Sequence, residues 1–490
     1  MKLKVRILIT YVIIPIIFWG CATTRLQHLN NTKQLIETIL QDSLFVSAHW
    51  GILVESLNTG EILYEHNADK LFIPASNQKI LTSAAALLSL GSDFTYETKL
   101  YASGEIIDSV LYGDLIIEGS GDPTFSSEFY VDPRLPFYCW TDTLRKLGIR
   151  KINGNIIGND DAFDEIKFGK GWMIDDLNYA FAAETNGLQF NENSIKLQII
   201  PPLNFHKPSC IFPELKSEYF KISNNLVTAK NPKSRITLVR PFDNNEIIVS
   251  GDIGIGSRID YRTISLSNPT IYFVTVLKEF LLEEGFEITG TAFDCDDIEN
   301  WNFVPENLSL IAVHKSPPLI DILQVMMKKS KNLYAETLLK TISWKQNGIG
   351  SFSDSRKIVQ NFLLDFDLKP EQYSYFDGSG LSRYNLISPQ QIVKVLKGVK
   401  QTEQNSFWED IMPVAGIFLE TPAVSIIRTV NEGNIKAKTG TMTNIRCLSG
   451  YVETPRGDAV FSILVNCHKL NSNQIDQQIN FILASVLENL

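Results

Sequence analysis

Histidine and cysteine are scarce in this chain, and neither occurs in a metal-binding pattern. The 490 residues include 6 His and 6 Cys. The sequence has no C-x-x-C pair and no H-E-x-x-H, spacings that place thiolates or imidazoles on one zinc ion. It also lacks G-x-S-x-G, the turn that carries the serine of α/β-hydrolases. We therefore predict no metal site and no cofactor.

Positive charge is in deficit over the whole chain. Lys and Arg number 45 against 55 Asp and Glu, which gives a formal net charge of −10. A protein that binds DNA or RNA through phosphates normally has a basic excess. Nucleic acid is therefore not an expected partner, and nothing in the sequence indicates the oligomeric state.

The most apolar stretch is too short to cross a membrane. Residues 7–20 are uncharged, whereas a spanning helix needs roughly 20 apolar residues. Lys2, Lys4 and Arg6 precede the stretch, and a basic start followed by a short apolar run is typical of a secretory signal. Because Gly20 is followed by Cys21, the segment resembles a bacterial lipoprotein signal with the lipid attached to Cys21.

Cleavage before Cys21 would remove two Lys and one Arg and move the formal charge from −10 to −13. In the resembled class, an uncharged residue after the lipidated cysteine, here Ala22, goes with sorting to the outer membrane. We therefore expect an exported, periplasmic protein that is lipid-anchored to the outer membrane. Phe18 and Trp19 depart from the small residues usual before Gly-Cys, so an uncleaved anchor and ordinary secretion remain alternative interpretations.

Apolar periodicity predicts an α+β protein in which one domain is interrupted by a long β-rich insertion. A hairpin over 51–72 and a helix over 77–90 begin the domain, and a strand pair around Gly457 with a helix over 474–488 ends it. We expect these two ends to fold together. The predicted parts are a signal peptide (1–20), a tether with a helix (21–44), a split domain (45–93 and 305–490) and the insertion (94–304).

Two cysteines near the C-terminus form a candidate disulfide. Cys447 and Cys467 are equidistant from Gly457, so a hairpin centred there would place them opposite each other. Two buried apolar thiols are the alternative interpretation.

Ser76 and Lys79 form the first candidate catalytic pair. At a helix start, a lysine three residues after a serine returns to the same face, which brings its amine to the hydroxyl. An S-x-x-K pattern alone is weak, because a chain of this length holds about two by chance. A plain N-cap role for Ser76 is the alternative.

Two further motifs follow along the chain. Ser330-Lys331-Asn332 lies between two helical runs, where a hydroxyl and an amide can face a cleft. Lys438-Thr439-Gly440-Thr441 begins a strand, and its glycine would let a ligand approach the backbone closely.

In this order and context, S-x-x-K, S-x-N and K-T-G resemble the motifs of penicillin-recognising serine enzymes. The surrounding sequence is most similar to class C low-molecular-mass penicillin-binding proteins, a family of D-alanyl-D-alanine carboxypeptidases/endopeptidases. The matching stretches are PASNQKILTSAAAL from Pro74, GDLIIEGSGDPTF from Gly113, GNIIGNDDAFD from Gly154, SKNLYAETLLK from Ser330, DGSGLSRYNLISP from Asp377, MPVAG from Met412 and KAKTGTMTNIRCLSGYV from Lys436. The resemblance spans about residues 45–468, and residues 417–430 depart from the family pattern.

The resemblance implies a serine DD-peptidase/β-lactamase-like domain, an antiparallel sheet flanked by helices. It implies that peptidoglycan stem peptides are the substrates and that β-lactam antibiotics bind. Ser76 would attack the penultimate D-alanine and form an acyl-enzyme, with Lys79 as the base and Ser330 as a proton relay. The implied substrate-binding residues are Asn332 for an amide, Lys438 and Thr439 for the terminal carboxylate, and Gly440 and Thr441 beside the oxyanion. Arg383 is a candidate substrate contact, with a structural ion pair as its alternative.

Two other functions remain open at this point. A β-lactamase of the same fold would need a further base to activate water for deacylation, and no separate motif for one is visible. A catalytically idle peptidoglycan-binding protein would not need the intact Ser76, Lys79, Ser330, Asn332 and Lys438.

Overall fold

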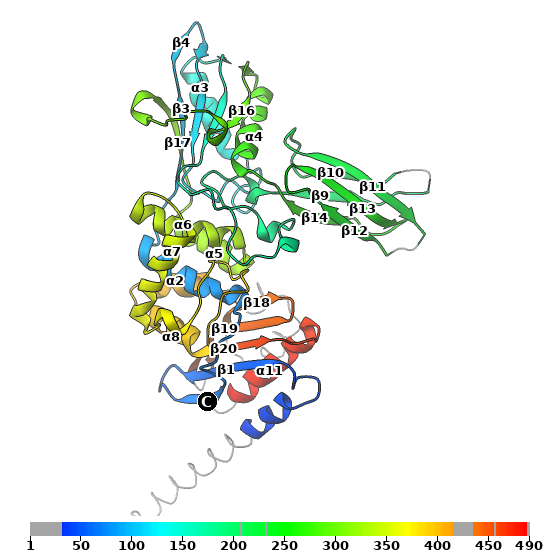
Figure 1. Ribbon diagram of the computed structural model, residues 1–490, viewed down its shortest axis with the longest axis vertical. Coiled ribbons are helices and arrows are strands. Elements are labelled where there is room, and N and C mark those ends of the chain that lie inside the picture. The colour runs from blue at the N-terminus through cyan, green and yellow to red at the C-terminus, as the bar shows by residue number, and fades with distance from the viewer. Residues whose placement is uncertain (1–31, 206–207, 231–232, 415–434, 455–456, 488–490) are drawn as a thin grey trace, which may run out of the picture. The chain divides into compact units, whose positions relative to one another are not determined.

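The computed structural model describes residues 32–205, 208–230, 233–414, 435–454 and 457–487 (Figure 1). The predicted signal and Cys21 lie outside these residues, and so do residues 417–430, which differ from the family pattern. Contacts divide the chain into two compact units. Unit 1 comprises Met1–Ala84, Leu363–Ser374 and Asn385–Leu490, and unit 2 comprises Ala85–Phe362 and Tyr375–Tyr384.

Unit 1 is built on a five-stranded antiparallel sheet that joins the two ends of the chain. Its strand order is β18-β19-β20-β1-β2. The strands are β1 (His49–Ser56), β2 (Ile62–His66), β18 (Ile435–Met442), β19 (Ile445–Thr454) and β20 (Gly457–Asn466). The first strand pairs with the last, with Ile52 opposite Ile463. The predicted hairpin, strand pair and joining of the two ends are therefore confirmed.

The β20 strand is buried along almost its whole length, which indicates that both faces of the sheet are covered. On one face α11 (Ser472–Leu487) packs Ile475, Ile479 and Leu483 against Ile463 of β20. Residues 32–40 are helical and add Ile36 to the same core. The helix α8 (Pro389–Lys400) contacts β20 and β1.

Local signals set the starts of the helices in unit 1. The α8 helix begins at a capping box in which Ser388 accepts from the Gln391 N–H and the Gln391 side chain accepts from the Ser388 N–H. The predicted helix over 77–90 is confirmed as a short 3-10 turn, η1 (Ala75–Asn77), that runs into α2 (Gln78–Leu90). Unit 1 also contains the short helix α9 (Asn405–Ile411).

Unit 2 contains four small sheets and several helices. The first sheet consists of β16 (Ala292–Asp294), β8 (Ile156–Asn159), β6 (Leu115–Glu118), β3 (Glu97–Ala102) and β17 (Ser309–Lys315). The second consists of β15 (Glu287–Ile288), β7 (Lys151–Ile152), β5 (Val110–Tyr112) and β4 (Glu105–Ile107). The third consists of β10 (Cys210–Pro213), β9 (Ser194–Ile200) and β14 (Asp260–Ser265), and the fourth of β11 (Lys221–Ala229), β13 (Glu246–Gly254) and β12 (Arg235–Val239).

The helices of this unit are α3 (Leu135–Lys146), α4 (Pro269–Glu283), α5 (Leu319–Lys329), α6 (Asn332–Asn347) and most of α7 (Phe352–Leu363). The first two were not indicated by the sequence. Because α4 is rich in β-branched and aromatic residues, its pattern favours a strand. It is a helix because Asn268 caps the Ile271 N–H at 3.0 Å and Pro269 occupies the first turn.

The predicted domain boundaries at 94 and 304 do not coincide with the compact units, which group residues 305–362 with 94–304. These boundaries stay a prediction. Among the described residues, no helix combines the length and the apolar character needed to cross a membrane.

The predicted register of the last hairpin is wrong, and with it the disulfide. Thr454 pairs with Gly457, so the hairpin is centred before Gly457 and not on it. Cys447 consequently lies opposite Leu464, whereas Cys467 follows the end of β20 and is exposed. Both thiols are free, and the Cys447 thiol is buried, 3.7 Å from the Ile73 carbonyl oxygen.

Candidate active site

The first motif of the candidate site is held at the start of α2. Lys79 Nζ donates a hydrogen bond of 3.0 Å to Ser76 Oγ, which confirms the geometry expected from the spacing. Lys79 is fully buried, whereas Ser76 is partly exposed. The residue before the serine, Ala75, has a φ of +46°, a left-handed conformation that is uncommon for alanine and is often found at functional sites. The serine is therefore accessible and its hydroxyl already has an amine at bonding distance.

A buried asparagine joins this turn to the strand of the third motif. Asn77 Nδ2 donates to the Lys438 carbonyl oxygen at 2.9 Å. Ser449 Oγ on β19 donates to Asn77 Oδ1 at 2.6 Å. The turn that carries Ser76 is thus fixed to both β18 and β19. The sequence analysis did not identify Asn77 or Ser449 as site residues. Asn77 is a polar residue directly after Ser76 and just before an apolar helix, and this position was a usable signal for a buried polar contact.

Gly440 lies where β18 approaches the same turn. A Cβ added there would lie 2.7 Å from the Pro74 carbonyl oxygen and 3.2 Å from Ala75 Cβ. A side chain at this position would therefore push β18 away from the nucleophile turn. The space at Gly440 is occupied by the chain's own turn.

Lys438 is a buried cation in a positively charged environment. Burial lowers the pKa of its ammonium well below the usual value, and the charges of Lys79 and Arg446 lower it further. Its Nζ donates to the Thr439 carbonyl oxygen at 3.0 Å. A desolvated ammonium beside other cations gains strongly from an incoming anion. This end of the site is suited to a carboxylate ligand.

Arg446 on β19 connects the third motif with α11. Its guanidinium makes a bidentate ion pair with Asp476, with bonds of 2.5 and 2.7 Å. It also donates to Thr441 Oγ1. The hydroxyl of Thr441 is therefore positioned by a buried, rigidly paired arginine.

The second motif belongs to unit 2, and its loop lies between helices as predicted. Ser330 follows α5 in a left-handed conformation with a φ of +57°. Lys331 Nζ makes ion pairs of 2.8 Å with Glu128 and 2.7 Å with Glu192. Asn332 Nδ2 donates to the Phe181 carbonyl oxygen at 2.8 Å. Lys331 and Asn332 are thus held in place by the chain around them.

A pocket of about 350 Å³ opens beside this motif within unit 2. Ser330 and Asn332 line it together with Tyr179 and Phe181. The two aromatic rings are stacked, with centroids 5.1 Å apart, and both are exposed. The hydroxyl and amide of the motif therefore border a partly aromatic hollow.

Arg383 lies in unit 2 on a loop that two buried carboxylates organise. Asp377 accepts from Trp172 Nε1 at 2.9 Å and from the Gly380 N–H at 2.8 Å. Glu336 accepts from the backbone N–H groups of residues 378 and 379, and burial, together with the Asp377 charge, raises its pKa to about 8.

The guanidinium of Arg383 donates to Met173 Sδ at 3.1 Å. In the part of the chain that the structure describes, no salt bridge involves it. Its charge nevertheless acts on the Asp176 carboxyl, whose pKa burial raises and Arg383 lowers. The role of Arg383 stays a prediction. The predicted site residues are divided between the units, with Ser76, Lys79 and Lys438–Thr441 in unit 1 and Ser330, Asn332 and Arg383 in unit 2.

One cluster in unit 2 has the composition of a cation site. Asp160, Asp294, Cys295 and Asp296 bring one ligand atom each within 4.8 Å of one another. Hydrogen-bond donors already serve the buried carboxylates, because Thr270 donates to Asp160 at 2.5 Å and an asparagine donates to Asp294 at 2.9 Å. The cluster joins residues far apart in sequence, which spacing rules do not detect. The expectation of no metal stays a prediction.

Comparison with known proteins gives consistent matches along nearly the whole chain. A family model described as the D-Ala-D-Ala carboxypeptidase 3 (S13) family matches residues 32–486. The D-alanyl-D-alanine carboxypeptidase of Actinomadura sp. (strain R39) is 28% identical over 452 residues, which cover 90% of this chain and 82% of that protein. The D-alanyl-D-alanine carboxypeptidase DacB of Haemophilus influenzae is 26% identical and covers 84% of this chain and 83% of its own length.

The solved structures agree on the fold. The crystal structure of penicillin binding protein 4 (dacB) from Haemophilus influenzae has a TM-score of 0.77 at 23% identity and covers 91% of this chain and 98% of that one. The same protein has also been solved in complex with a β-lactam, with a TM-score of 0.71, 22% identity and coverage of 92% of this chain and 98% of that one. The predicted fold class is confirmed by this likeness.

The junction at Asn77 should contribute strongly to stability. Replacing it by alanine (Asn77→Ala) leaves the buried Lys438 carbonyl without this donor, at about 1–3 kcal/mol for an unsatisfied group, and removes one of the two partners of the Ser449 hydroxyl, which keeps Ser462. We expect urea unfolding to show a loss of about 2–4 kcal/mol. The matched control Asn473→Ala, on the exposed start of α11, should stay within about 0.5 kcal/mol of wild type. Equal stability of the two variants would contradict the assigned role.

Proposed function

Because the chain belongs to the D-Ala-D-Ala carboxypeptidase 3 (S13) family, we propose that it is a serine-type peptidase that cleaves the D-Ala-D-Ala bond of peptidoglycan stem peptides through an acyl-enzyme at Ser76. The single observation that carries this proposal is the 3.0 Å hydrogen bond between Lys79 Nζ and Ser76 Oγ. An activated nucleophile requires a base at this distance. The proposal covers both release of the terminal D-alanine and cleavage of D-alanyl cross-links.

In the proposed reaction, Ser76 Oγ attacks the carbonyl carbon of the penultimate D-alanine while the neutral amine of Lys79 takes the hydroxyl proton. The tetrahedral intermediate collapses when the C–N bond breaks, and the leaving nitrogen receives a proton. Water then attacks the ester, and Ser76 regains its proton. The base role of Lys79 rests on its hydrogen bond to Ser76 Oγ, which places the amine where it can accept the hydroxyl proton.

Substrate binding is assigned from the same contacts. Lys438 and Thr439 bind the terminal carboxylate, since the buried ammonium of Lys438 lacks solvent and lies among other cations. The backbone N–H groups of Ser76 and Thr441 hold the oxyanion, and the close approach at Gly440 supports this pairing of turn and strand.

The family resemblance also suggests roles for three residues of unit 2. Ser330 relays the proton to the leaving nitrogen, Asn332 binds the substrate amide, and Arg383 contacts the stem peptide. The ion pairs of Lys331 support these roles, because they fix the loop that bears both motif residues. β-Lactams are expected to acylate Ser76, since they mimic the acyl donor.

The decisive variant is Ser76→Ala. We expect it to abolish covalent labelling by a fluorescent penicillin and to reduce D-alanine release from a D-Ala-D-Ala peptide by at least about 10³-fold. The matched control is Ser83→Ala on the same helix, because the buried Ser83 hydroxyl has no hydrogen-bond partner among the described residues. It should keep both labelling and activity.

Labelling that survives in Ser76→Ala would overturn the assignment of the nucleophile. Efficient turnover of a chromogenic cephalosporin, without release of D-alanine, would favour a β-lactamase instead. Mass analysis of products from muropeptide monomers and cross-linked dimers measures the carboxypeptidase and endopeptidase activities separately.

The lowered pKa of Lys438 predicts an alkaline limb in substrate binding. The ammonium is present below that pKa and is lost as the pH rises through it. Because this pKa is lowered, the binding of a free terminal carboxylate begins to weaken at a lower pH than it would with an ordinary lysine. We expect kcat/KM for a D-Ala-D-Ala peptide to fall on the alkaline side. The same peptide with an amidated C-terminus should react slowly and lack this limb. Identical alkaline limbs for both peptides would contradict the role of Lys438.

We further propose that the protein is exported to the periplasm and anchored to the outer membrane by a lipid on Cys21. The basic start, the apolar residues 7–20 and the Gly20-Cys21 pair support this. The variant Cys21→Ser should move the protein from the membrane to the soluble fraction and abolish incorporation of a labelled fatty acid. The control Cys139→Ser, which alters an exposed free cysteine, should change neither. Unchanged fractionation and labelling of Cys21→Ser would refute the anchor.

A further inference from the structure

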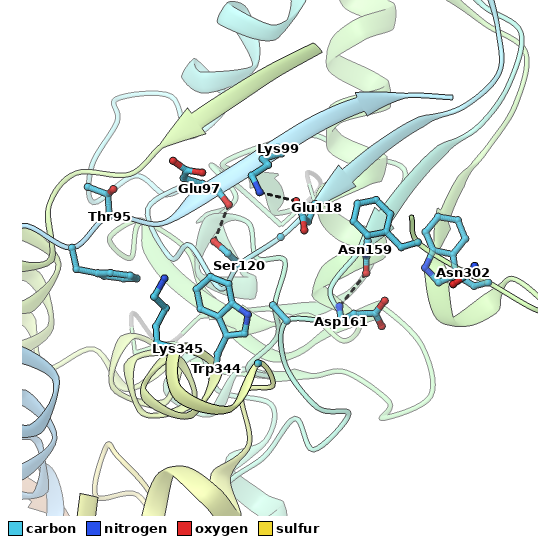
Figure 2. A pocket seen from close by; sticks show the side chains of 16 residues that line it. Thr95, Glu97, Lys99, Glu118, Ser120, Asn159, Asp161, Asn302, Trp344 and Lys345 are labelled. Atoms are coloured by element: carbon cyan, nitrogen blue, oxygen red, sulfur yellow. Dashed lines mark hydrogen bonds and ion pairs between the residues drawn. The ribbon is translucent and has the colours of Figure 1, made fainter. Parts of the chain in front are cut away.

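Unit 2 contains a further hollow besides the one that Ser330 and Asn332 line. It has a volume of about 910 Å³ and lies between the β3, β6 and β8 strands, the end of α6 and the loop around residue 301 (Figure 2). This volume is at the upper end of the range for small-ligand sites, about 300–1,000 Å³. None of the residues of the three motifs lines it.

Aromatic rings line this hollow from three separate segments of the chain. Phe94 precedes β3, Trp344 lies near the end of α6, and Trp301 and Phe303 belong to the loop after residue 298. All four are half-buried, so each keeps part of its ring open to the hollow. Trp301 and Phe303 stack at 6.4 Å and 15°, and Phe303 also packs edge-on against Tyr101 at 5.7 Å. The rings are therefore supported by the fold.

The polar groups of the hollow carry both signs of charge. Lys345 Nζ lies 4.9 Å from the centre of the Trp344 ring and 5.5 Å from that of Phe94. Within the described part of the chain, no carboxylate lies at ion-pair distance from this ammonium. Lys99 pairs with Glu118 at 3.2 Å, and Glu97 and Asp161 contribute further carboxylates (Figure 2).

This combination selects a class of ligand. A phosphorylated or strongly anionic ligand is disfavoured, because three carboxylates outnumber two lysines. A purely apolar ligand is disfavoured, because it would bury these charged groups without partners. A sugar fits both features, since its C–H faces pack on aromatic rings and its hydroxyl and amide groups take donors and acceptors of either sign.

We propose that this hollow binds the amino-sugar units of a peptidoglycan glycan strand. The inference rests on the proposed function, because that function makes peptidoglycan the polymer the protein acts on. Stem peptides are covalently attached to the glycan, so a glycan contact raises the effective concentration of the peptide at the peptidase site. The hollow would thus favour polymer-attached stem peptides over free ones.

The test uses the full chain after acylation with a β-lactam, which occupies the peptidase site. Isothermal titration is carried out with a tetrasaccharide of alternating N-acetylglucosamine and N-acetylmuramic acid whose lactyl carboxyl groups are capped as simple amides, and separately with a free D-Ala-D-Ala pentapeptide. We expect the tetrasaccharide to bind and the pentapeptide not to bind. Successful acylation reports on the proposed function independently of glycan binding, so failure of one is distinguishable from failure of the other.

Two variants and a control assign the binding to this hollow. Trp344→Ala and Lys345→Gln should each weaken tetrasaccharide binding by about tenfold or more, a difference of about 1.4 kcal/mol. Lys345→Gln alters an exposed side chain without an ion pair, so it should fold normally even if Trp344→Ala does not. The control Tyr112→Ala removes an aromatic ring that is 53% exposed on β5 and does not line the hollow. It should bind as wild type does.

The same variants should raise KM for glycan-attached stem peptides and leave hydrolysis of the free pentapeptide unchanged. Absence of tetrasaccharide binding would overturn the proposal, as would binding that Lys345→Gln and Trp344→Ala leave intact. Binding of the pentapeptide to the acylated protein, weakened by these substitutions, would overturn it in favour of a peptide site.

Discussion

The bond network around Asn77 is the constraint on which the candidate site of unit 1 depends. Its side chain donates to the backbone of β18 and accepts from Ser449 of β19. The turn bearing Ser76 is thereby attached to a sheet that joins residues from both ends of the chain. Gly440 allows the approach, because any side chain there would meet the carbonyl of Pro74. A nucleophile held in this way needs little reorganisation before it reacts.

The positive charges of unit 1 determine which kind of ligand the candidate site favours. Lys79, Lys438 and Arg446 concentrate positive charge, and the ion pair of Asp476 is made with the arginine. The buried ammonium of Lys438 is consequently disfavoured until an anion arrives. The energy of burying these cations thus favours a substrate that ends in a carboxylate.

In unit 2, buried and half-buried carboxylates position short loops that bear the other polar residues. Glu128 and Glu192 hold Lys331 between the two residues of its motif, and Glu336 and Asp377 hold the loop before Arg383. Glu128, Glu192 and Glu336 come from segments distant from the loops they hold, whereas Asp377 belongs to its own loop. All four bind N–H or ammonium groups of the protein, so they act on the position of the loops. The proposed glycan hollow is built from the same unit. It would let one unit contact both the peptide and the sugar parts of a polymer.

The sequence by itself determined the three motifs, the α2 helix and the strands at both ends, because local periodicity and spacing specify these features. It did not determine the β19–β20 register, since a hairpin centred before Gly457 displaces Cys467 from Cys447 without altering either strand pattern. It also missed α4, whose buried surroundings override its strand-like composition. Only the tertiary structure brought Asn77 to Ser449 and the four rings to one hollow, because these contacts join residues that no local pattern relates.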